Sequence, residues 1–288
     1  MNKGNRMIKK TLLIALLIAA LGYLALSARA PRSYVLQTTS LDEASGLACS
    51  IRNQNILWSH NDSGGKAAVY ALDTQGRLVC SLELQGVKNR DWEELAVARD
   101  PKTGLSHIYI GEIGDNNARY ESLKIYKVEE PVLSPGDTLL STDRFETYDF
   151  IYDDGARDAE AMFVEPVSGD IYIISKREEQ VGLYRIAAPT TAKKNVAVRI
   201  SSLPLAWVTA ADLSPNGKKL LVKTYTGVFK FKSKLAKNGE LVISKHPKAL
   251  PYKVEPQGEG ICWDSKAKGY FTLSEAAEDT PQMLYYYR

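Results

Sequence analysis

A short acidic motif recurs at three places in the chain. In "RDWEELAV" it supplies Asp91 and Glu93, in "RDAEAMFV" Asp158 and Glu160, and in "QGEGICWD" Glu259. Each copy stands directly before an apolar run. Carboxylates that lie close together repel one another, so such a group binds a cation or prepares an acid–base pair. The alternative is that each acid only hydrogen-bonds the backbone of its own loop.

The elements that position these acids form a repeat of about fifty residues. Its copies begin at "EASGLACS", "DWEELAVA", "DAEAMFVE", "TAADLSPN" and "QGEGICWD". Aligning them places one apolar residue at a common position: Leu47, Leu95, Met162, Leu213 and Ile261. A polar turn and two further runs rich in Val, Ile, Leu and Tyr follow each start, which is typical of β-strands.

Four antiparallel strands in each repeat predict an all-β fold, a β-propeller with five repeats. The last repeat lacks a fourth strand, and residues 33–39 read as a spare strand that would close the ring and leave no open edge. Six blades are the alternative, if residues 129–143 hide degenerate strands. We therefore expect one propeller domain over residues 31–288.

In a propeller, the start of the innermost strand and the end of the second strand open on one face of the ring. Several acids of this chain fall at those points: Glu43, Asp62, Asp91, Glu112, Asp158 and Glu259. Hard oxygen ligands suit Ca²⁺ or Mg²⁺, whereas the few histidines do not favour a zinc site. The sequence predicts a divalent cation there, with Ca²⁺ as the first candidate.

The same face is expected to carry catalytic and ligand-binding groups. Glu93, Glu160 and His60 are the candidate acid–base residues. The candidates for gripping an anionic ligand are Arg157, Lys176, Arg177, Lys223 and Tyr225.

The first thirty residues differ from the rest. Lys3, Arg6, Lys9 and Lys10 precede an uncharged apolar run over residues 11–27, and Ala28-Arg29-Ala30 matches a cleavage motif. Residues 1–30 are thus predicted to be a signal peptide or an uncleaved membrane anchor. Either way the propeller would be extracytoplasmic, in the periplasm or secreted, and tethered to the inner membrane if the segment is not cut.

Composition and charge limit the classes of partner that we expect for this chain. The net charge is +3 and the lysines are scattered, so no nucleic-acid partner is expected. The three cysteines, Cys49, Cys80 and Cys262, lie in apolar runs and are interpreted as small buried residues, with a bridge from Cys49 to Cys80 or Cys262 as the alternative.

Together, "EASGLA", "WSHNDSG", "DWEELA", "GEIGDN", "DAEAMFVEP" and "LSPNGKKLLVKTYTG" resemble exported bacterial β-propeller proteins, and distantly the esterase-like phytase and gluconolactonase-type propellers. This resemblance implies six blades, a divalent metal in the central funnel and hydrolysis of esters or lactones. It also implies that Glu43 is an acidic metal ligand.

Three functions stay open. The first is a binding module that holds a divalent cation and a small, anionic or envelope-protein ligand in a polar funnel. The second is a metal-dependent hydrolase of phosphate esters, esters or lactones. The third is a protein-interaction scaffold without a small ligand. The residues alone do not decide whether the chain is an enzyme.

Overall fold

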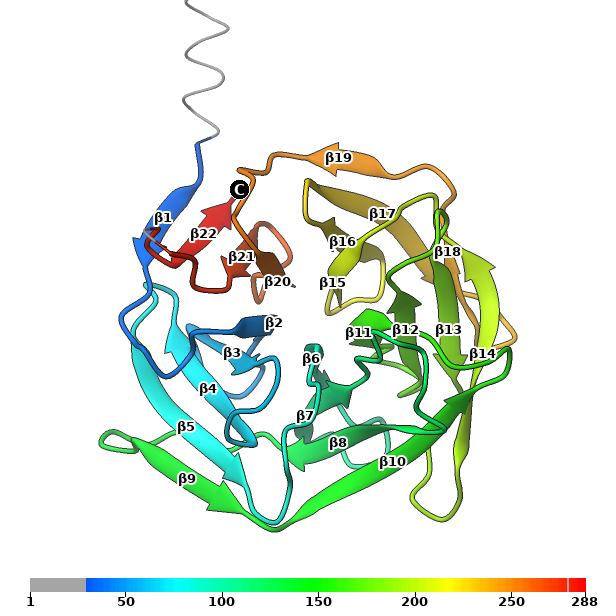
Figure 1. Cartoon of the computed structure of the whole chain (residues 1–288), viewed down its shortest axis with the longest axis horizontal. Coiled ribbons are helices and arrows are strands. Elements are labelled where there is room, and N and C mark those ends of the chain that lie inside the picture. Colours follow the sequence, from blue (N-terminus) through cyan, green and yellow to red (C-terminus); the bar gives the residue numbers. More distant parts are fainter. Residues whose placement is uncertain (1–29, 279) are drawn as a thin grey trace, which may run out of the picture.

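The computed structural model describes residues 30–278 and 280–288, and every regular element within them is a β-strand. The strands surround a central axis (Figure 1). The predicted all-β propeller class is confirmed. The predicted signal peptide or anchor lies outside the described residues, apart from Ala30. Within the described part of the chain, no helix has the length and apolar character needed to cross a membrane.

Five inner strands line the axis. They are β2 (Ala44–Cys49), β6 (Glu94–Arg99), β11 (Ala159–Val164), β15 (Val208–Leu213) and β20 (Gly258–Trp263). Each packs beside the next in this order, and β20 packs beside β2, so the inner strands form a closed ring (Figure 1).

Each inner strand pairs antiparallel with a second strand, which pairs with a third. The second strands are β3 (Ile56–Asn61), β7 (Ser106–Glu112), β12 (Ile171–Ser175), β16 (Lys219–Thr224) and β21 (Tyr270–Ser274). The third strands are β4 (Ala68–Asp73), β8 (Leu123–Glu129), β13 (Gly182–Ile186), β17 (Gly227–Leu235) and β22 (Met283–Tyr287).

The outermost strands are β5 (Leu78–Leu84), β10 (Phe145–Tyr152), β14 (Asn195–Ser202), β18 (Leu241–Ile243) and β1 (Arg32–Val35). The strand expected over residues 33–39 is shorter in the structure, where β1 ends at Val35, and it pairs antiparallel with β22 as the closing strand of the last group. Within residues 129–143 the structure forms one strand, β9 (Leu139–Thr142), which extends the first group by running parallel to β5. A short strand β19 (Lys248–Leu250) pairs with β17.

The core consists of five apolar clusters, each between two neighbouring groups of strands. Each cluster contains one of the five aligned apolar residues: Leu47, Leu95, Met162, Leu213 and Ile261. The repeat read from the sequence therefore corresponds to a packing unit, because each copy sends the same residue against the preceding group. Burying one such side chain contributes about 1.5–3 kcal/mol.

Four inner strands begin with a β-bulge. The register shifts at Gly46 in β2, Glu160 in β11, Thr209 in β15 and Glu259 in β20. A bulge leaves one residue unpaired and re-aims its side chain. The side chains of Glu160 and Glu259 are thus directed away from the apolar interfaces between the sheets, where burying a charged group would be unfavourable.

Candidate functional site

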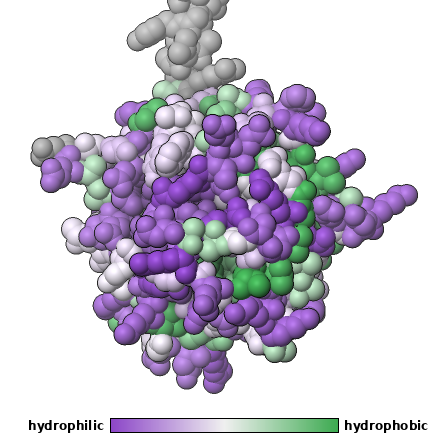
Figure 2. Space-filling view, turned by 45° about the vertical axis from the view of Figure 1, so that its right-hand side comes forward, coloured by the Kyte–Doolittle hydropathy of each residue, from purple (hydrophilic) through white to green (hydrophobic). Residues whose placement is uncertain are grey.

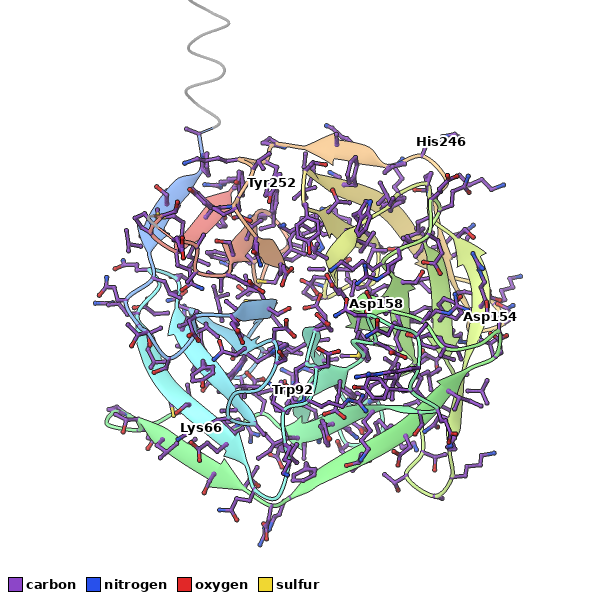
Figure 3. The ribbon with its side chains drawn as sticks, viewed as in Figure 1. Lys66, Trp92, Asp154, Asp158, His246 and Tyr252 are labelled. Atoms are coloured by element: carbon purple, nitrogen blue, oxygen red, sulfur yellow. The ribbon has the colours of Figure 1, made fainter. Side chains whose placement is uncertain are left out.

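One end of the central channel gathers the starts of the inner strands and the ends of the second strands. Backbone hydrogen bonds fix this arrangement: Asp62 N donates to Glu43 O at 2.9 Å, and Lys176 N donates to Asp158 O at 3.1 Å. We call this end the mouth. In Figure 3, Asp158 and Trp92 lie nearer the axis than Lys66, Asp154 and His246, which lie at the outside. The visible surface is largely hydrophilic, with small hydrophobic patches (Figure 2).

Three carboxylates converge at the mouth. Asp62, Asp91 and Glu93 each place an oxygen within 4.8 Å of the others. Asp62 follows β3, whereas Asp91 and Glu93 precede β6 and flank Trp92, which is fully buried in the core. Trp92 N donates to Asp62 O at 2.8 Å, so the backbone bond that anchors the tryptophan also brings the two acidic segments together.

Gly114 makes room for this trio. A Cβ atom at Gly114 would collide with the carboxylates of both Asp91 and Glu93. The carboxylates of Asp91 and Glu93 therefore pack directly against the backbone of Gly114, and a side chain at this position would push them apart. The sequence analysis did not single out Gly114, although its place in "GEIGDN" at the end of a second strand was a signal.

The trio carries electrostatic strain. Burial and the charges of Asp91, Glu259 and Glu43 raise the pKa of Asp62 to about 7. Burial and the charges of Asp62 and Asp91 raise the pKa of Glu93 well above its usual value. Burial, followed by the charge of Asp158, also raises the pKa of Asp91. Because the charged forms repel each other in a partly dehydrated site, a proton or a cation is favoured there.

A second set of acids is already neutralised. Lys176 is buried, forms an ion pair with Glu160 and donates to the Tyr225 hydroxyl at 3.1 Å. Tyr225 in turn donates to Glu259 Oε1 at 3.0 Å. The two acids at the bulges thus belong to a chain of bonds around Lys176, whose positive charge also faces the trio.

Asp158 and Glu112 have cationic partners of their own. Arg177 Nε lies 2.7 Å from Asp158 Oδ2, and Asp115 N donates to Asp158 Oδ1 at 3.0 Å. Arg90 lies 3.5 Å from Glu112. These two predicted metal ligands are therefore engaged outside the trio. Glu43 is exposed at the rim and acts on Asp62 through its charge.

Three other predicted residues lie at the same end of the ring, but they are buried or held by partners and do not join the three carboxylates. His60 is fully buried against Trp92, and burial lowers its pKa to about 4, which makes it an inaccessible neutral imidazole. Lys223 is fully buried 3.8 Å from Glu255, so it cannot contact a ligand. Arg157 is held by Asp154 and Glu178. Each sits near a strand end in sequence, but the surrounding side chains turn it inward or outward.

Comparisons with known proteins leave the family undecided. No protein-family model matches, and no curated protein matches. Among solved structures, hydrazine synthase from Kuenenia stuttgartiensis is 14% identical, with a TM-score of 0.40, over 84% of this chain and 58% of that chain. A functionally unknown protein from Desulfotomaculum acetoxidans is 10% identical, with a TM-score of 0.43, over 80% of this chain and 65% of that chain. This chain thus spans less than two thirds of either.

Proposed function

We propose that this protein is an extracytoplasmic β-propeller that binds a divalent cation, Ca²⁺ as the first candidate, through Asp62, Asp91 and Glu93. The observation that carries the proposal is the convergence of three carboxylates within 4.8 Å. Asp62 Oδ1 supports it, because this buried atom has no hydrogen-bond partner among the described residues. The donor set is all oxygen, which suits a hard cation.

The ligand of this module would be small and anionic, or an acidic part of an envelope protein. Lys176, Arg177 and Tyr225 stand beside the trio, and Trp207 lies on the rim with half of its surface exposed. A carboxylate or phosphate could contact the cation and these donors together. The extracytoplasmic location rests on the basic and apolar pattern of residues 1–30.

Calorimetric titration of the purified full chain with Ca²⁺, Mg²⁺ and Mn²⁺ tests the cation site. We expect binding that Asp62→Asn or Glu93→Gln weakens by tenfold or more. The matched control is Glu83→Gln on the outer strand β5, where Glu83 pairs with Lys66, and it should bind as the wild type does. If none of the three cations binds, the proposal is overturned.

A metal-dependent hydrolase is the second candidate, favoured by the raised pKa of Glu93 within the trio. A bound cation would supply a more acidic water, and a carboxyl with a raised pKa can hold the proton. Turnover of phosphate esters, esters or lactones that needs both the cation and Glu93 would support this function. Cation binding without turnover would leave the binding module. A scaffold without a small ligand is the third candidate, and the charged lining of the mouth lends it no support.

A further inference from the structure

A cavity opens at the end of the channel opposite the mouth. All five inner strands start at the mouth and end here, and the cavity, about 490 Å³, is lined by their last residues and the turns that follow. Its walls are mostly apolar, with Ala48, Val97, Val164, Leu213 and Trp263 among them. A volume of this size accommodates a small organic molecule.

The polar groups of the lining turns are used locally. Asp264 accepts hydrogen bonds from the backbone N–H groups of Lys266, Lys268 and Gly269 in its own turn. Ser214 Oγ donates to Asn216, and Ser50 Oγ donates to Glu130. These side chains pin turns, so they do not define what the cavity would bind.

Asp212 is different. It lies on β15 and lines the cavity, and its Oδ2 accepts one hydrogen bond, from Trp263 N at 2.7 Å. Over residues 30–278 and 280–288, Asp212 forms no ion pair. Burial raises its pKa to about 7. This half-buried carboxyl thus lacks the positive charge with which an acid away from bulk water is ordinarily paired.

The groups around Asp212 add negative charge. Burial together with the charges of Asp212, Asp264 and Glu130 raises the pKa of the Cys49 thiol to about 12. Glu94 lies deeper in the channel, and the charge of Asp212 acts on it. Arg99, also on the lining, is exposed and donates to Gly104 O. An anion is therefore disfavoured, and a metal ion would find only one free carboxylate among apolar walls.

We infer that this cavity binds a small organic ammonium ion with an apolar body, the ammonium on Asp212 and the body against Leu213, Val97 and Trp263. An ion pair formed away from bulk water is stronger than one in solution. Lys219 Nζ already lies 5.5 Å from the centroid of the Trp263 ring, so this ring offers the ligand an apolar wall and not a site for the ammonium. The apolar part of the ligand would replace water along the walls.

The test compares two probes of matched shape, 2-phenylethylamine and 2-phenylethanol, by calorimetry on the purified full chain. A charge-assisted hydrogen bond should favour the amine by about tenfold to hundredfold. Asp212→Asn keeps an acceptor for Trp263 N but removes the charge, and it should abolish this preference. Val97→Trp fills the cavity while leaving Asp212 in place, and it should abolish amine binding even if Asp212→Asn fails to fold.

The acids of the mouth provide the control for location. In Asp62→Asn the preference for the amine should be unchanged. Equal binding of the two probes, or no amine binding at millimolar concentration, overturns the inference. It is also overturned if the preference survives Asp212→Asn or if the amine still binds to Val97→Trp. Loss of the preference in Asp62→Asn overturns it as well, because the amine then binds at the mouth.

Discussion

Glu94 on β6 accepts a hydrogen bond from the backbone N–H of Ala211 on β15, at 2.9 Å. These inner strands are not neighbours in the ring, because β11 lies between them, so the bond crosses the central channel. The other oxygen of Glu94 accepts from Leu95 N at 3.1 Å. Glu94 thereby links β6 to β15 across the channel through a buried side chain.

Removing this cross-channel bond should destabilise the ring. Glu94→Ala leaves the N–H groups of Ala211 and Leu95 without partners, and each unsatisfied buried group costs about 1–3 kcal/mol. Glu94→Gln retains one acceptor oxygen and should cost less than Glu94→Ala. Urea denaturation of both variants measures the loss, and the peripheral variant Glu83→Gln should stay within about 0.5 kcal/mol of wild type. Wild-type stability of Glu94→Ala would show that the bond is unimportant.

A methyl group at Gly114 should weaken cation binding. Its Cβ would collide with Asp91 and Glu93, so Gly114→Ala is expected to separate the carboxylates and reduce Ca²⁺ affinity tenfold or more. Gly65→Ala is the matched control, because a Cβ there comes no closer than 3.9 Å to a neighbouring side chain, that of Asn61. Calorimetric titration compares the two variants. Equal affinity in both would contradict a cation site at the trio.

The cation-free protein should lose stability as pH rises from about 6.5 to 8. Asp62 and Glu275 have folded-state pKa values of about 7 and about 8, raised first by burial and then by neighbouring acids. An acid whose pKa is higher in the folded state than in the unfolded state stabilises the folded state fully below its unfolded-state pKa. This contribution is lost as pH rises through the folded-state pKa. His60, with its pKa lowered to about 4, contributes its pH dependence below this window.

Saturating Ca²⁺ should make the stability less dependent on pH, because the bound cation takes the place of the protons that the trio otherwise holds. Asp212, whose pKa of about 7 arises from burial at the other end of the channel, should keep a smaller residual slope. Denaturation midpoints at pH 6.5 and 8, with chelator and with Ca²⁺, provide the measurement. A rise in stability with pH in the presence of chelator would refute the expectation.

The three cysteines are free, and they should react with an alkylating reagent at different rates. Cys80 and Cys262 are fully buried, whereas Cys49 is half-buried beside the cavity opposite the mouth. Burial raises the pKa of all three thiols, which keeps them protonated and slow. Mass spectrometry after iodoacetamide treatment at pH 8 should find slow labelling at Cys49, and labelling of the other two only after unfolding. Rapid labelling of Cys262 would contradict the packing between β2 and β20.

The sequence by itself determined the class of fold and the end of the ring where charged groups gather. Short apolar runs and polar turns recur with one period, and this local pattern defines strands and their order. Leu47, Leu95, Met162, Leu213 and Ile261 could be aligned because each occupies an equivalent place in its repeat. The spacing also placed Asp91 and Glu93 at the start of an inner strand.

Only the tertiary structure decided which acids meet. Asp158 has the same motif as Asp91, yet Arg177 and the backbone of Asp115 take its oxygens, while Asp91 joins Asp62 and Glu93. Glu160 pairs with Lys176, and Glu94 spans the channel. The repeat determines the strand position from which a side chain projects, because the geometry of a strand depends on residues that are near one another in the chain. Its partners come from other strands brought near by closure of the ring, and no spacing within one repeat records them.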